Sequence, residues 1–129
     1  MNHRYRTPIK QARGLGSAKE GTQHFILQRL TAIALVFLAC WFLYFVIGLM
    51  QADYLTASDA VARPWNATLL IAFLLAMFWH AQLGVQVVIE DYGHSHGPAL
   101  AAQVVVRFVC ILAALASVFA VVIIALGGA

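Results

Sequence analysis

Charged residues are scarce in this 129-residue chain: Asp, Glu, Lys and Arg make up 10% of it, whereas 63% of its residues are hydrophobic. A water-soluble domain of this size needs far more charge on its surface. The shortage excludes an ordinary soluble domain, and the long uncharged runs predict an integral membrane protein. Because lipid offers the backbone no hydrogen-bond partners, we expect an all-α fold of membrane-spanning helices.

Several kinds of functional motif are also missing. The two cysteines, Cys40 and Cys110, stand alone inside apolar runs, without the spacing of a zinc or iron–sulfur site. The sequence holds no Ser-His-Asp arrangement, no phosphate-binding loop and no metal-ligand cluster. It also lacks the internal repeat that many transporters show. We therefore expect no catalysis by this chain alone.

Three stretches are long and apolar enough to cross a bilayer, which needs about 20 residues. They are predicted at about residues 28–50, 66–90 and 99–126. Thr22 and Asn66 are the expected N-caps of the first two helices. The connection at 51–65 is interpreted as a plain linker. Residues 21–129 are thus predicted to form a single three-helix transmembrane domain.

Basic residues crowd the start of the chain, where Glu20 is the only acid in the first twenty residues. These basic residues are Arg4, Arg6, Lys10, Arg13 and Lys19. Positively charged segments favour the inner side of a membrane, so residues 1–20 are predicted to be a cytoplasmic or matrix-side arm. Three spans then place the C-terminus outside. Ahead of a span, a basic tail sets topology or contacts anionic lipid, and no nucleic-acid partner is expected.

His80 is the one histidine inside a predicted span. An ionisable residue at such depth is usually functional, and a neutral imidazole can ligate haem iron without bringing a charge into the membrane. Gly84, one turn along on the same face, leaves room for a flat macrocycle or for a close helix. The alternative role of His80 is a hydrogen bond between helices. If two histidines hold a haem, the second must come from another chain, either a different protein or a second copy.

Three further residues gather at the predicted inner surface. Asp91 follows His80 by eleven residues, about 16 Å along a helix and on nearly the same face. Acids oppose the dipole at a helix C-terminus, which hints at a role for Asp91. Tyr92 can donate a hydrogen bond to a quinone carbonyl while Asp91 orients a neighbour or relays protons, or the pair is an ordinary interfacial cap. Arg29 is either a topology anchor or a partner for a haem propionate.

The pattern His80-x-x-x-Gly84 followed by Asp91-Tyr92, which closes the second of three spans, resembles the small hydrophobic membrane anchor of succinate dehydrogenase (respiratory complex II). The segment GTQHFILQRLTAI at 21–33 is similar to the start of that family's first span. With length and topology, the resemblance covers nearly all of the chain from about residue 14. Gln23 departs from it, because some members carry a histidine there, and no role is carried onto Gln23.

The resemblance implies that His80 is one axial ligand of the iron of a b-type haem and that Arg29 approaches its propionates. The other histidine would come from a second, different membrane anchor, against which the helices pack. Tyr92, with Asp91 beside it, would contact ubiquinone. An iron–sulfur subunit would dock on the inner face, and a flavoprotein subunit would oxidise succinate. The chain would be a multi-pass protein of the bacterial inner (cytoplasmic) membrane, in preference to the mitochondrial inner membrane.

Three other functions remain open at this point. The chain can be the anchor of a quinol:fumarate reductase, in which electrons run in the opposite direction. It can be a homodimeric b-haem electron-transfer protein, in which case the purified chain alone holds six-coordinate haem. It can also be a structural or assembly protein that holds no haem at all.

Overall fold

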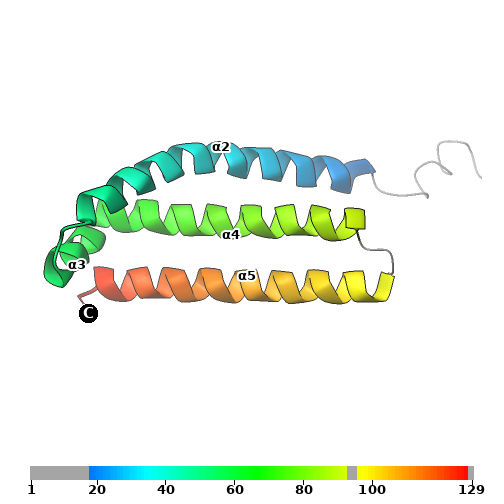
Figure 1. The fold of residues 1–129 in the computed structure, drawn as a ribbon. Coiled ribbons are helices and arrows are strands. Elements are labelled where there is room, and N and C mark those ends of the chain that lie inside the picture. Colours follow the sequence, from blue (N-terminus) through cyan, green and yellow to red (C-terminus); the bar gives the residue numbers. More distant parts are fainter. Residues whose placement is uncertain (1–17, 93–95, 128–129) are drawn as a thin grey trace, which may run out of the picture.

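The computed structural model describes residues 18–92 and 96–127, which form four helices and no strand (Figure 1). The helices are α2 (Ala18–Leu49), α3 (Tyr54–Ala62), α4 (Pro64–Tyr92) and α5 (His96–Ala125). The three long helices lie side by side, and α4 is the central one that packs against both α2 and α5. Short α3 lies across one end of the bundle. The predicted all-α fold is confirmed.

Three helices of the described part are long and apolar enough to cross a membrane. Their spanning segments are Phe25–Leu49, Pro64–Asp91 and Gly97–Ala125. These lie within a few residues of the three predicted spans, because charge is so costly in lipid that the uncharged runs bound the helices closely. The last helix ends near Gly127, whose positive φ of 78° is the left-handed conformation in which a C-terminal glycine commonly stops a helix.

The helix starts differ from the predicted caps. α2 begins at Ala18, so Thr22 lies one turn inside the helix, and the end of the predicted basic arm is already helical. α4 begins at Pro64, which suits a first turn because the N–H that proline lacks would have no helical partner there. Asn66 is therefore inside α4, and its Nδ2 donates to the Ala60 carbonyl oxygen at 2.7 Å. Both predicted N-caps are wrong.

The predicted plain linker contains α3. Asp53 is its N-cap and accepts a hydrogen bond from the Thr56 backbone N–H at 3.1 Å. Hydrogen bonds from the side chain and the backbone of Thr56 lower the pKa of the Asp53 carboxyl, because they favour its ionised form. The cap is thus complete above the ordinary pKa of this carboxyl and weakens as pH falls through the lowered one.

The buried core is small and lies at the α3 end of the bundle. Ala67 and Leu70 of α4 are buried together with Val121 of α5. Partly buried hydrophobic residues pack around them: Trp41, Phe42, Phe45, Val61, Ile71, Leu74 and Ala125. Phe42 of α2 also stacks on Phe73 of α4, with ring centroids 4.6 Å apart. Aromatic packing therefore fastens α2 to α4 at this end.

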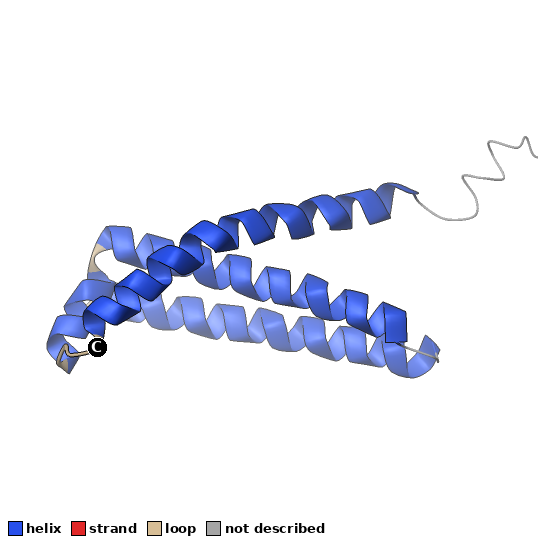
Figure 2. Cartoon of the chain, turned by 45° about the horizontal axis from the view of Figure 1, so that its top comes forward, coloured by secondary structure: helices blue, strands red, loops and turns tan. Residues whose placement is uncertain are grey.

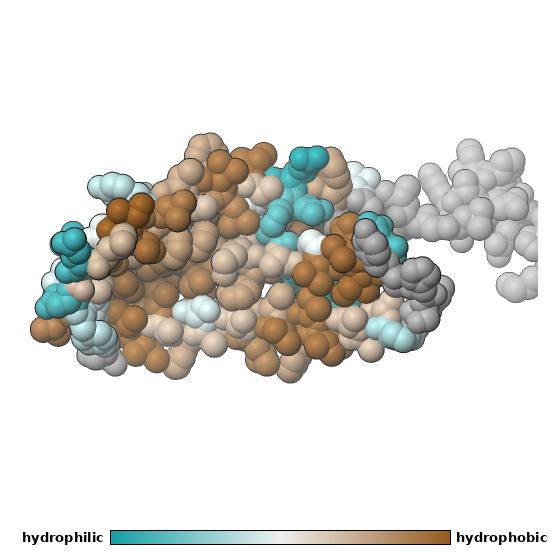
Figure 3. Space-filling view, viewed as in Figure 1, coloured by the Kyte–Doolittle hydropathy of each residue, from teal (hydrophilic) through white to brown (hydrophobic). Residues whose placement is uncertain are grey.

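Toward the opposite end, α2 diverges from α4 and α5 (Figure 2). Leu83 is the one buried hydrophobic residue described outside the small core. The space-filling view is predominantly apolar, with hydrophilic residues near α3 and over the N-terminal half of α2 (Figure 3). Such an apolar exterior is suited to lipid or to another membrane chain rather than to water.

Leu70→Ala is expected to destabilise the packed end by about 2 kcal/mol or more, because truncation leaves a cavity that a packed core fills only in part. Leu75→Ala is the matched control on the same helix, since Leu75 is 52% exposed and its truncation is expected to change stability by less than about 0.5 kcal/mol. Thermal unfolding of the detergent-solubilised protein, followed by circular dichroism, measures both. Equal losses would contradict the location of the core.

Candidate functional site

His80 lies at depth on α4 and is half-buried. Its Nδ1 is 3.0 Å from the Oγ1 of Thr31 on α2. The same Oγ1 donates toward the carbonyl oxygens of Leu27, at 2.9 Å, and Gln28, at 3.1 Å. The interhelical hydrogen bond considered for His80 is therefore present. It occupies one ring nitrogen and leaves Nε2 for another partner.

A cavity of about 310 Å³ opens beside His80. Its other lining residues come from α2 and are Phe25, Gln28, Arg29 and Ala32. The fold thus brings together Arg29 and His80, two of the predicted site residues that are far apart in sequence. The guanidinium carbon of Arg29 lies 5.3 Å from the centroid of the Phe25 ring, a cation–π contact that holds this exposed side chain near the cavity.

Gly84 faces open space. A Cβ placed on it would meet no atom within 4 Å, so none of the described helices packs closely against it. Gly84 lies one turn beyond His80, so no side chain of its own narrows the helix face at that level. A neutral imidazole, a nearby cation and an open wall fit a flat cofactor that has acidic substituents. The residues present therefore suit a haem ligated from one side by this chain.

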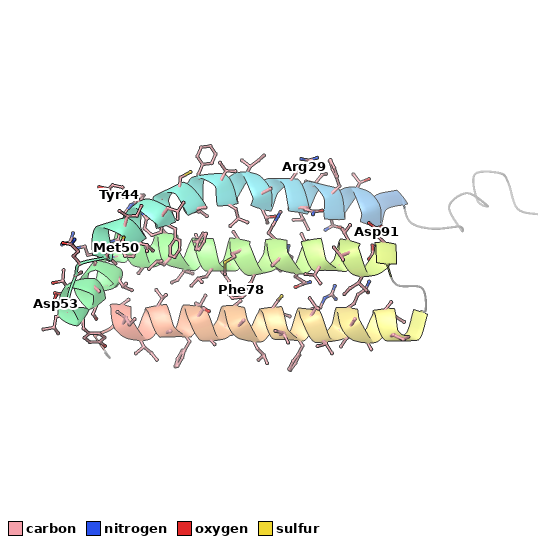
Figure 4. The ribbon with its side chains drawn as sticks, viewed as in Figure 1. Arg29, Tyr44, Met50, Asp53, Phe78 and Asp91 are labelled. Atoms are coloured by element: carbon pink, nitrogen blue, oxygen red, sulfur yellow. The ribbon has the colours of Figure 1, made fainter. Side chains whose placement is uncertain are left out.

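Asp91 is exposed near the end of α4, in the same half of the bundle as Arg29 (Figure 4). Tyr44, Met50 and Asp53 mark the opposite end in that view. Asp91 does not line the cavity beside His80. The side chain of Tyr92 lies outside the described residues. The geometry therefore brings together the predicted haem residues but leaves the predicted quinone residues as an expectation.

A second cleft, of about 490 Å³, is not predicted by the sequence analysis. Its lining comes from all three long helices: Gln23, Leu27, Trp79, Gln82, Leu83, Gln86, Arg107 and Ile111. Beside it, the side-chain amides of Gln86 and Gln103 donate to Glu90 Oε1 at 2.8 and 3.4 Å. Glu90, an acid at an unfavourable helix end, thus has partners within the chain. The sequence does carry a signal for this polar face: Gln82, Gln86 and Glu90 follow one another at four-residue spacing, which places all three on one face of a helix.

Within the described residues, no group of three or more His, Cys, Asp or Glu side chains gathers as a metal site. The cavity lined by α2 and α4 contains one imidazole, that of His80. A two-histidine site needs a further ligand from outside the described residues.

A family model described as succinate dehydrogenase/fumarate reductase transmembrane subunit matches residues 3–126. The succinate dehydrogenase hydrophobic membrane anchor subunit of Rickettsia bellii is 41% identical over 92 residues, covering 71% of this chain and 74% of the relative. That of Rickettsia conorii is 32% identical over 121 residues, covering 93% and 96%. That of Paracoccus denitrificans is 39% identical over 92 residues, covering 69% of each chain. No solved structure matches this chain.

The bacterial relatives and the three apolar helices support the predicted multi-pass location in the inner membrane. Their shared description also confirms that a chain of this kind is a non-catalytic part of a larger enzyme. The family match extends over almost the whole sequence and agrees with the fold. This chain therefore belongs to the succinate dehydrogenase/fumarate reductase transmembrane subunits, as a membrane anchor of succinate dehydrogenase.

Proposed function

We propose that this anchor supplies half of a b-type haem site, with His80 as an axial ligand of the iron and Arg29 as the partner of a propionate. The observation that carries the proposal is that His80 and Arg29 line one cavity, of about 310 Å³. Haem bound there supplies a one-electron redox centre inside the membrane. The chain's own contribution is to hold and orient it.

Each residue of this site has a distinct task. His80 offers a neutral nitrogen lone pair, which places no charge in the spanning helix. Arg29 offers a planar fork of N–H donors, which matches a carboxylate in geometry and sign. Gly84 has no side chain and no atom within 4 Å of where its Cβ would lie, which leaves room at that point for a planar ring to approach the helix.

The second axial histidine is proposed to come from a second, different membrane anchor of the same complex. The described cavity is walled by α2 and α4 alone, so another chain can approach it from the remaining side. We place the N-terminus inside, following the basic arm, with the iron–sulfur subunit over Arg29 and the end of the bundle where α4 ends and α5 begins. A flavoprotein subunit beyond it would oxidise succinate. The relatives described above are succinate dehydrogenase subunits, which favours this direction over fumarate reduction.

The quinone site is proposed to include Tyr92 and Asp91. Both belong to the last turn of α4, and Asp91 is exposed in the half of the bundle that also carries Arg29. The Tyr92 hydroxyl would donate a hydrogen bond to a ubiquinone carbonyl. The Asp91 carboxylate would orient a neighbouring group or pass on a proton that quinone reduction consumes.

His80→Ala is expected to lower the haem content of the purified complex by about tenfold or more, because the described residues that line the cavity include no other imidazole to replace the lost ligand. Gln82→Ala is the control, since Gln82 lies two residues away but lines the second cleft. The Soret absorbance, normalised to the flavoprotein, measures the haem content. An unchanged spectrum in His80→Ala would refute the ligand assignment.

Purification in mild detergent is expected to recover this chain with a flavoprotein, an iron–sulfur protein and a second membrane anchor. The chain expressed without the second anchor is expected to hold no haem, since it offers one axial ligand. Mass spectrometry identifies the partners, and the visible spectrum detects haem. A stable six-coordinate haem spectrum from the chain alone would instead support the homodimeric electron-transfer protein.

Tyr92→Phe is expected to lower ubiquinone reduction by about tenfold, the effect of losing one hydrogen bond worth roughly 1.4 kcal/mol. Succinate oxidation with a soluble artificial electron acceptor is expected to persist, because that reaction does not use the quinone site. Steady-state assays with the two acceptors separate these effects. Equal losses in both assays would assign Tyr92 to assembly of the complex.

A further inference from the structure

The hydroxyl of Thr31 on α2 lies against the imidazole of His80 on α4, with Oγ1 and Nδ1 3.0 Å apart. We infer that Thr31 is a positioning residue for His80: its oxygen accepts a hydrogen bond from Nδ1–H and holds the ring in the tautomer whose Nε2 is free to bind iron. This inference rests on the proposed haem function. It adds a residue whose own atoms do not contact the iron.

The direction of this hydrogen bond follows from the number of protons. A threonine hydroxyl has one proton and two lone pairs, whereas the carbonyl oxygens of Leu27 and Gln28 can only accept. If the hydroxyl proton points to a carbonyl, at 2.9 or 3.1 Å, the contact with His80 needs a proton on Nδ1. Both hydrogen bonds then form at once. In the other tautomer, the hydroxyl gives its single proton to the ring and loses its carbonyl partner.

The tautomer decides whether the ring can be a ligand. A neutral imidazole carries one proton, so Nδ1–H leaves an unprotonated Nε2 with its lone pair available. The alternative tautomer places the proton on Nε2 and blocks coordination there. Ligating histidines commonly donate their second ring N–H to an oxygen for this reason. Thr31 supplies that oxygen from a different helix.

The position of Thr31 also fixes the orientation of the ring. Threonine is branched at Cβ and therefore restricted in χ1, and its contacts with two backbone carbonyls restrict it further. Its neighbours Gln28 and Ala32 line the same cavity as His80. The hydroxyl is thus a stiff acceptor at the edge of the proposed haem cavity, and the imidazole cannot rotate without breaking the contact.

The hydrogen-bonded chain has an electronic consequence. The ring N–H donates to a hydroxyl that in turn donates to a carbonyl, and such chains strengthen each bond. An acceptor on Nδ1–H increases the electron donation of Nε2 to the metal, which favours the ferric state. Loss of the hydroxyl therefore weakens haem binding and raises the midpoint potential of the haem.

The test compares Thr31→Val with Thr31→Ser in the assembled complex. Valine keeps the shape of threonine but has no hydroxyl, whereas serine keeps the hydroxyl. Thr68→Val is the matched control, because the Thr68 hydroxyl also donates to a carbonyl in its own helix, that of Pro64 at 2.8 Å, and lies away from the His80 cavity. The measurements are haem per flavoprotein, the haem-loss rate in detergent, the low-spin ferric EPR signal and the midpoint potential.

We expect Thr31→Val to lose haem about tenfold faster, with a shifted EPR signal and a raised midpoint potential. Thr31→Ser and Thr68→Val are expected to match the unsubstituted complex. If Thr31→Val matches the unsubstituted complex in all four measurements while His80→Ala lacks haem, the role of Thr31 is overturned and His80 stays the proposed haem ligand. A normal Soret band in His80→Ala would overturn the haem assignment and this inference with it. If Thr31→Val fails to assemble, Thr31→Ala replaces it as the variant without a hydroxyl. An EPR signal and a midpoint potential that are the same in Thr31→Ser and Thr31→Ala would then show that the hydroxyl has no effect and would overturn the inference.

Discussion

The hydrogen bond between Thr31 and His80 joins α2 to α4 beside the cavity and sets the position of the proposed ligand. In lipid, a buried polar group without a partner is strongly unfavourable, so an imidazole and a hydroxyl on facing helices stabilise each other's presence there. The contact fixes α2 against α4 at the level of the cavity. Arg29, two residues before Thr31, is thereby placed beside the same cavity.

This contact also makes the two roles predicted for His80, a hydrogen bond between helices and a haem ligand, compatible with each other. A structural hydrogen bond and a ligand function are alternatives only if they need the same nitrogen. Imidazole has two, and the hydrogen bond uses Nδ1. The structural role thus prepares the ring for the proposed one, because the proton that binds Thr31 is the proton that would otherwise occupy Nε2.

The three spans can be predicted to within a few residues because charge is excluded from lipid so strongly. The helix caps cannot be predicted in the same way. Thr22 and Asn66 are good N-cap residues, but the preference of such residues for the cap position is weak beside the tendency of a helix to continue. The short α3 is not evident from the sequence because nine residues between polar ends resemble a linker. The role of Thr31 depends on the rotation of α2 about its axis, which the sequence does not reveal. The spacing of Gln82 and Gln86, in contrast, does indicate the polar face of the second cleft.

The uneven distribution of packing along the bundle has a mechanical consequence. Aromatic and aliphatic side chains clamp α2 to α4 at the α3 end, and toward its N-terminal end α2 diverges from the other helices. α2 is therefore held to α4 at the α3 end and again at Thr31, and its first turns extend beyond both contacts. A small bend of α2 near Thr31 becomes a larger displacement of these first turns, where little packing resists it. The first turns of α2 can consequently move while the core and the Thr31–His80 hydrogen bond stay intact.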